Sequence, residues 1–93
     1  MVIASLRLEL RLIQDVGLWR KRRLIRSIVH EVHKRHNVSI AEVDRLDHPT
    51  ECVLGVVAVG TGRREVRSIL HRVAKILNAH PRAELTGQTL VEA

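Results

Sequence analysis

Aromatic residues are nearly absent from this 93-residue chain: Trp19 is the only one, and there is neither phenylalanine nor tyrosine. Hydrophobic residues make up 45% of the chain. An interior must therefore be built from leucine, isoleucine, valine and alanine. Cys52 is the only cysteine, which excludes an internal disulfide and gives no support for the bridge-stabilised folds of small exported proteins.

Long apolar runs, signal-peptide patterns and linkers are also missing. No apolar stretch approaches the length of a membrane-spanning helix, and the N-terminus lacks a charged segment followed by an apolar one. We therefore expect a cytoplasmic protein with no membrane partner. With two prolines and five glycines, the chain has no low-complexity segment that would divide it. Residues 1–93 are predicted to form one domain.

Positive charge is concentrated on two segments of the chain. Leu18–His36 carries seven lysines and arginines against one acidic residue, and Gly62–Ala79 carries five against one. The other residues are mildly acidic in sum, although the net charge of the chain is +6. Such gathering is typical of a surface that meets a polyanion, nucleic acid above all. Arginines outnumber lysines by thirteen to three, which favours phosphate recognition because guanidinium groups bind phosphate with two hydrogen bonds.

The first half of the chain predicts a strand, a helix and a second strand. Apolar and polar residues alternate over Val2–Leu12, as in a half-buried strand. Apolar residues at helical spacing over Leu18–His36 predict an amphipathic helix. Val38–Leu46 is rich in β-branched residues, but its alternation is imperfect. We therefore expect a strand with a bulge or a twist there.

The second half predicts a strand, a helix and a final strand. Cys52–Val59 is apolar at both odd and even positions, which predicts a central strand covered on both faces. Apolar residues at helical spacing over Val66–Leu77 define a second amphipathic helix. It ends before Pro81, because the residue preceding a proline disfavours helix. Glu84–Val91 is a weaker final strand.

The predicted order is β-α-β-β-α-β, which is the ferredoxin-like arrangement of the α+β class. Right-handed crossovers place both helices on one face of a four-stranded antiparallel sheet. The first and third strands then lie in the centre of that sheet. The opposite face of the sheet stays open.

Each predicted helix carries a row of basic residues and histidines outside its apolar stripe. The first row runs down one flank of its helix, and the second lies opposite the stripe. The rows are Arg22, Arg26, His30 and His33, and Arg64, Arg67, His71 and Lys75. Because both helices lie on one side of the sheet, we expect these rows to form one continuous basic surface. An ordinary solvated surface is the alternative, although such a surface normally interleaves acidic residues with the basic ones. The predicted nucleic-acid-binding residues are Lys21, Arg22, Arg23, Arg26, Arg63, Arg64, Arg67 and Lys75.

The kind of nucleic-acid contact follows from what the strands lack. An RNA-recognition motif stacks bases on aromatic residues of its central strands, and the first and third predicted strands have none. Contacts are therefore expected to go mainly to phosphates, with weak sequence specificity. Trp19 either stacks on a base or seals the edge of the core. The turn Gly60–Arg64 either holds a phosphate or only connects strand to helix.

No constellation of catalytic or metal-binding residues stands out. His30, His33 and His36 are three residues apart, whereas the zinc-protease helix needs histidines four apart. Glu42 and Asp44 share one side of a predicted strand, where an exposed polar edge accounts for them. We therefore expect a non-enzymatic protein with no catalytic residue, metal or cofactor.

Three segments carry a family resemblance: Lys21–Arg23 at a helix start, Asn37–Asp44, and Leu54–Val59. Through them the chain resembles the YlxP-like family of small bacterial proteins, which is catalogued as a domain of unknown function. The resemblance covers nearly the whole length and implies a ferredoxin-like fold. Genes of this family often lie near those for ribosome-binding factor A and translation initiation, which implies a role around RNA or ribosome maturation.

The chain departs from the family pattern where the first helix begins. Family members usually have Ser-Leu-Lys-x-Lys-Arg at this place, whereas this sequence has Gly17 for the serine and Trp19 for the first lysine. Only Lys21 and Arg22 match directly. The resemblance supplies no catalytic residue that could be transferred.

Two functions are consistent with the sequence. The first is a non-enzymatic RNA- or ribosome-associated binding domain that uses the basic face of its two helices. The second is a homo-oligomeric protein-interaction module, a homodimer through the open face of the sheet. In that case Val53, Val57 and Val59, or their neighbours of opposite parity, meet the partner.

Overall fold

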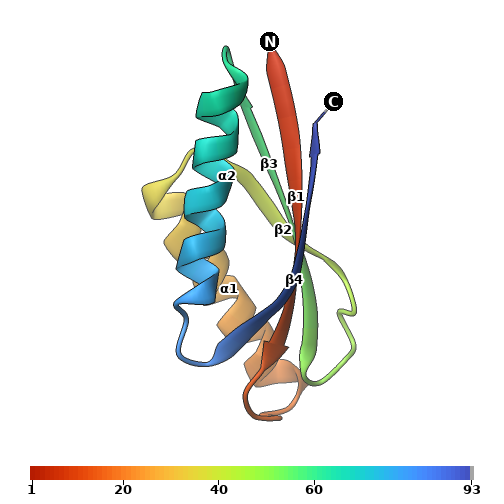
Figure 1. Ribbon diagram of the computed structural model, residues 1–93. Helices are drawn as coiled ribbons and strands as arrows, with labels where there is room; N and C mark the ends of the chain where they lie inside the picture. Colours follow the sequence, from red (N-terminus) through yellow and green to blue (C-terminus); the bar gives the residue numbers. More distant parts are fainter. Residues whose placement is uncertain (93) are drawn as a thin grey trace.

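The order of helices and strands agrees with the sequence prediction. A computed structural model, in which residues 1–92 are described, has the order β-α-β-β-α-β (Figure 1). The elements are β1 (Val2–Leu12), α1 (Leu18–Arg35), β2 (Ser39–Asp44), β3 (Glu51–Gly60), α2 (Arg63–Asn78) and β4 (Ala83–Glu92).

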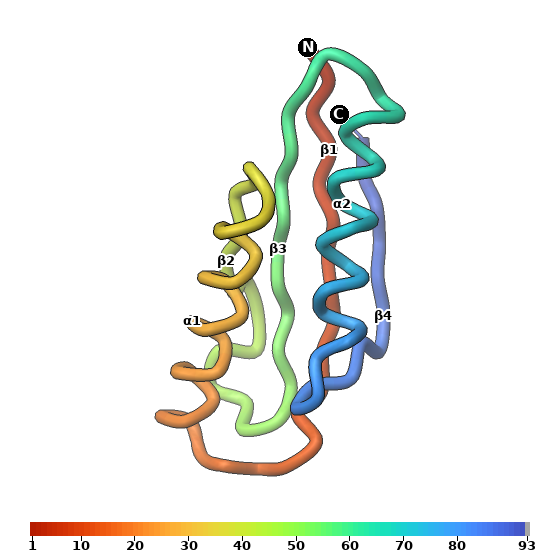
Figure 2. Tube along the Cα trace, turned by 90° about the vertical axis from the view of Figure 1, so that its left-hand side faces the viewer, coloured from red at the N-terminus to blue at the C-terminus, as the bar shows by residue number. Residues whose placement is uncertain are grey.

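The four strands form one antiparallel sheet in the order β2-β3-β1-β4. The strands β1 and β3 are therefore central, as predicted, and β2 and β4 are the two edges. Both helices lie on one face, with α1 on the side of β2 and α2 packed against β3, β1 and β4 (Figures 1 and 2). The fold is ferredoxin-like α+β.

The core lies between the sheet and the two helices and is aliphatic apart from Cys52 and Lys21. Alternate residues of β1, from Ala4 to Leu12, point into it because a strand turns successive side chains to opposite faces. Trp19 lies outside the core with 67% of its surface exposed, so it does not seal a core edge. The core side chains of the helices are Ile25, Ile28, Val32, Val66, Leu70, Val73, Ala74 and Leu77.

The prediction that β3 is covered on both faces is wrong. Its even positions, such as Leu54 and Val56, are buried against the helices. On the other face, Val57 and Val59 are 42% and 56% exposed, because no second layer covers that side of the sheet. Only Val53 is fully buried there.

The irregularity predicted for the second strand is a bulge at Val43. The register of β2 on β3 shifts between Glu42 and Asp44, so Val43 is an extra residue. A methyl group built at Gly55 would lie 3.0 Å from a Val43 side-chain carbon. The valine therefore lies over the glycine on the open face of the sheet. The Val43 side chain therefore covers part of β3 on the face of the sheet opposite the helices.

Several loops meet at the end of the sheet where α1 begins and α2 ends (Figure 2). The loop between β1 and α1 is held there by a hydrogen bond from the Ile13 backbone N–H to the Arg82 carbonyl, 3.0 Å long. The Leu12 N–H donates to the Thr50 carbonyl at 2.7 Å. The first bond ties the start of the β1–α1 loop to the turn that precedes β4, and the second ties the end of β1 to the residue before β3. Within residues 1–92, neither helix is long and apolar enough to span a bilayer.

Candidate nucleic-acid interface

Lys21 is fully buried, so its prediction as a nucleic-acid contact is wrong. The physical reason is its position on α1. At 100° per residue, position 21 falls on the same side of the helix as Ile25 and Ile28, which both pack in the core. The spacing i, i+4, i+7 with two isoleucines was the sequence signal for burial, and the neighbouring basic residues obscured it.

The Lys21 ammonium holds the loop between β2 and β3. Its Nζ donates to the carbonyl oxygens of Arg45 at 2.7 Å and His48 at 2.6 Å, and more weakly to that of Leu46 at 3.4 Å. These three acceptors match the three N–H donors of an ammonium group. Arg45 has a positive φ of 57°, an uncommon conformation for a residue other than glycine. Lys21 therefore fixes a strained loop to α1.

Glu42 supplies the negative charge that compensates this buried cation. Its Oε2 lies 3.2 Å from Nζ of Lys21 and accepts no hydrogen bond from residues 1–92. The positive charge of the lysine therefore compensates the burial of this carboxylate. Cys52 lies near the same carboxylate. Burial, and then the negative charge of Glu42, raise the pKa of the Cys52 thiol to about 12. This thiol stays protonated at neutral pH and is a poor nucleophile.

One arginine of each predicted row reaches toward a different edge of the sheet. Arg22 lies 3.4 Å from Oδ1 of Asp47, in the loop that follows the edge strand β2. Arg67 hydrogen-bonds through Nε to Glu92 on β4, and Arg63 approaches the same carboxylate at 4.0 Å. Because β2 and β4 are the outer strands, Arg22 and Arg67 do not share one continuous surface, contrary to the prediction for these two residues.

The reason lies in the rotation of α1 about its own axis. Leu24 follows Arg22 by two residues, so the two side chains leave α1 in directions about 200° apart around the helix axis. Leu24 and Ser27 face the turn that follows α2, where they line a cleft with Pro81. The flank that carries Arg22 therefore faces away from α2. At the other edge, the Arg67 hydrogen bond, together with the charges of Arg67 and Arg63, lowers the pKa of the Glu92 carboxyl below its usual value.

Most cations of the helices nevertheless have no carboxylate partner. Of the twelve lysines and arginines on α1 and α2, five make ion pairs and seven make none with residues 1–92. The exposed guanidinium of Arg23 lies 4.9 Å from the centre of the Trp19 ring. The seven helical cations without a carboxylate, called the free cations below, are Arg20, Arg23, Arg26, Lys34, Arg64, Arg72 and Lys75.

The predicted set and the free cations overlap in four positions. Arg23, Arg26, Arg64 and Lys75 are exposed and unpaired within the described residues. The other predicted arginines have carboxylate partners, and Lys21 is buried. The four shared residues are therefore the part of the prediction that remains available for a phosphate.

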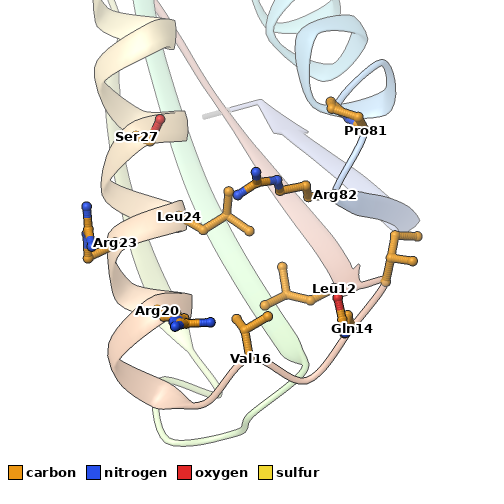
Figure 3. Close-up of a pocket in the computed structure, with 10 residues that line it drawn as sticks. Leu12, Gln14, Val16, Arg20, Arg23, Leu24, Ser27, Pro81 and Arg82 are labelled. Carbon is orange, nitrogen blue, oxygen red and sulfur yellow. The ribbon is translucent and has the colours of Figure 1, made fainter.

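A cleft at the end of the sheet contains two arginines that the predicted set omits. It has a volume of about 820 Å³ and lies between the start of α1 and the turn before β4. Arg20 and Arg82 point into it from opposite walls (Figure 3). Arg82 lies outside both basic segments of the sequence. The β-α-β-β-α-β order, which brings the start of α1 and the start of β4 to one end of the sheet, was the signal that could have found it.

These features define a small ferredoxin-like α+β domain in which seven of the twelve helical cations have no carboxylate partner among residues 1–92. The profile of a family described as "Protein of unknown function (DUF503)" matches residues 3–89. The chain is also 32% identical over 76 residues to "Uncharacterized protein YlxP" of Bacillus subtilis strain 168, an alignment that covers 81% of this chain and 83% of YlxP. The chain belongs to this family, which confirms the resemblance to YlxP-like proteins.

Proposed function

We propose that this protein is a non-enzymatic binding domain for RNA or a ribosomal particle. The observation that carries the proposal is the group of free cations on the two helices. Arg20, Arg23 and Arg26 follow one another at three-residue spacing on α1. Like charges at this spacing repel one another, which lowers the stability of the free protein. Bound phosphates would remove that repulsion and form charge-assisted hydrogen bonds.

The first turn of α1 supports the same function. It contains no acidic residue, and its Gly17 cap provides no side-chain hydrogen bond. Arg20 stands there instead, at the positive end of the helix dipole, where a cation is unfavourable. The start of α2, in contrast, has Glu65 in its first turn. An anion bound near the start of α1 would compensate both the dipole and the arginine.

The proposed contacts are to phosphates, not to bases. The open face of the sheet has no aromatic side chain on which a base could stack, since Trp19 lies on α1. Guanidinium and ammonium groups on a helical surface bind the backbone of a nucleic acid with little dependence on its sequence. RNA would therefore lie across the helices and leave the sheet face free.

Salt dependence of RNA binding tests this proposal. Fluorescence anisotropy with a labelled single-stranded RNA should give a log–log salt slope of about −3 for four phosphate contacts. Replacing Arg23, Arg26, Arg64 and Lys75 by serine should remove most of the affinity. An affinity that does not change between 50 and about 200 mM salt, the range over which such contacts weaken strongly, would end the proposal.

A matched control variant separates free from paired cations. Replacing Arg22, Arg35, Arg63 and Arg67 by serine removes the same number of positive charges from the same helices. All four make carboxylate contacts in the free protein. This control should retain much more RNA affinity than the variant of the four free cations. If both variants lose the same RNA affinity, binding depends on the net charge of the protein and not on which cations are free.

A second candidate function is self-association through the open face of the sheet. In the strand register, Ile3 pairs with Val59, and Ser5 pairs with both Val57 and Val91. The three valines are 42 to 56% exposed, so they form an apolar strip of the kind that marks interfaces. Val53 is buried and would not take part. If light scattering gives a strict monomer at millimolar concentration, this second function is excluded.

A further inference from the structure

The cleft at the end of the sheet combines converging charges with an apolar wall. Its lining includes Arg20 and Arg82, the apolar side chains of Ile13, Val16 and Leu24, and no aspartate or glutamate. A volume of about 820 Å³ is within the usual range for sites of small ligands, about 300–1,000 Å³. The cleft is therefore large enough for a ligand that has both a charged and an apolar part.

The two arginines come from different parts of the fold and have no counter-ion. Arg20 lies in the first turn of α1, and Arg82 lies in the turn before β4 (Figure 3). Neither makes an ion pair with residues 1–92. Asp15, the acidic residue nearest to Arg20 in sequence, uses its Oδ1 to accept the Gly17 N–H at 2.9 Å. Two like charges that face a shared space are stabilised by an anion between them.

The backbone of Arg82 is held firmly in place. Its N–H donates to Nδ1 of His80 at 3.1 Å, and its carbonyl accepts the Ile13 N–H at 3.0 Å. The Arg82 side chain therefore projects from a fixed point on the cleft wall. Because the backbone at this point is already fixed, only the side chain has to become ordered when a ligand binds.

The rest of the lining distinguishes an organic phosphate from a simple anion. Ile13, which lines the same cleft, is 67% exposed, an unfavourable state for a large aliphatic side chain unless another apolar surface covers it. Gln14 and Ser27 add neutral hydrogen-bonding groups to the same cleft. A nucleotide has a phosphate for the arginines, a base face for the aliphatic wall and sugar hydroxyls for the neutral polar groups.

We propose that this cleft binds one nucleotide unit, with its phosphate between Arg20 and Arg82 and its base against Ile13 and Leu24. The inference rests on the proposed function, because the nucleotide is taken to be part of the bound RNA. This nucleotide site would add one defined contact to a helical surface that otherwise binds only the phosphates of the RNA. A free nucleotide has the same chemistry, and the experiment below separates the two sources.

The test uses the full chain and adenosine monophosphate as the probe. In a two-dimensional amide NMR spectrum, the nucleotide should shift signals of residues 13–27 and of Arg82. The variant Arg20→Gln/Arg82→Gln should lose these shifts and at least about tenfold of its affinity for single-stranded RNA. Its salt slope should fall by about 1.4, the value for two lost phosphate contacts. Both residues are exposed, and an unchanged thermal midpoint will verify the fold.

The matched control is Arg22→Gln/Arg35→Gln, which removes two charges of α1 that are already paired. It should keep the nucleotide shifts. If the cleft variant binds RNA as this control does, or if the nucleotide shifts no signal near the cleft, the inference is overturned. Inorganic phosphate that reproduces every shift at the same concentration would overturn the assignment of a nucleotide.

Two further comparisons identify the source of the nucleotide and separate the two proposals. A 5′-phosphorylated RNA that binds more tightly than its 5′-hydroxyl form, only when Arg20 and Arg82 are present, supports a terminal nucleotide. Equal binding of both forms supports an internal one. If RNA affinity is independent of salt while the nucleotide still shifts the cleft signals, the proposed function fails and the cleft stands as a site for free nucleotides.

Discussion

At the scale of single residues, Lys21 shows how a basic segment can contain a structural cation. Its charge is held by three backbone carbonyls and one carboxylate inside the molecule. Removing one partner of a buried ion pair leaves the other charge without compensation, which is usually more costly than replacing both partners together. Lys21 therefore belongs to the stability of the fold and not to the surface that meets a ligand.

We expect Lys21→Met to destabilise the protein by about 3 kcal/mol, because Glu42 and three carbonyl oxygens lose their partner. Urea denaturation followed by circular dichroism measures this loss. The double variant Lys21→Met/Glu42→Leu should recover part of it, since no buried charge remains. A single variant that unfolds at the same urea concentration as the unmodified protein would contradict the structural role of Lys21.

At the scale of elements, the turn between α2 and β4 depends on a neutral histidine. Nδ1 of His80 accepts the Arg82 N–H, and a protonated imidazole has no free acceptor nitrogen. Burial, and then the positive charge of Arg82, lower the pKa of His80 below its ordinary value of 6.5. The folded protein therefore takes up this proton less readily than the unfolded chain does.

The stability that His80 contributes is present above the ordinary histidine pKa and is lost as the pH falls from there toward its lower folded value. We expect His80→Asn to reduce this loss, because an asparagine oxygen can accept the same N–H and does not titrate. Urea midpoints of both proteins between pH 7.5 and about 5, the range in which histidine titrates, test this. Parallel pH profiles would show that His80 has no such role.

The helices and strands were predictable from the sequence, but the rotation of each helix about its own axis against the sheet was not. The strict alternation in β1 fixes which of its residues face the core, and the imperfect alternation of the second strand announced the bulge at Val43. The flank on which Arg22 and Arg67 lie depends on how each helix is turned against the sheet. The pairing of these arginines also depends on the positions of the Asp47 and Glu92 carboxylates. Those residues are distant in sequence, so their positions are set by the tertiary structure.

The candidate site was predicted only in part for the same reason. Arg23, Arg26, Arg64 and Lys75 follow from the helical wheel alone, since they lie away from the apolar stripes. The cleft does not, because Arg82 follows α2 in the chain and meets Arg20 only when the loops at one end of the sheet come together. Contacts between loops depend on hydrogen bonds such as that from Ile13 to Arg82, for which the sequence has no periodic signal.

At the scale of the whole molecule, the two faces differ in character. The helical face carries the free cations, and the sheet face carries an exposed strip with Val57, Val59 and Val91. On the sheet face, Arg7 is paired with Glu9 at 3.5 Å and approaches Asp44 at 3.8 Å. A polyanion is therefore expected on the helices, while the sheet face remains free for a second copy of the chain.

Mapping of RNA contacts by amide NMR tests the central claim most directly. A short single-stranded RNA, added to the isotope-labelled protein at low salt, should shift signals of α1 and α2 near Arg23, Arg26, Arg64 and Lys75. The RNA should leave the amide signals of the β3 residues Val57 and Val59 unchanged. Added salt should reverse the shifts of the helical signals. Shifts confined to the sheet face, or no shifts at all, would contradict the assignment of the helical layer as the RNA-binding surface.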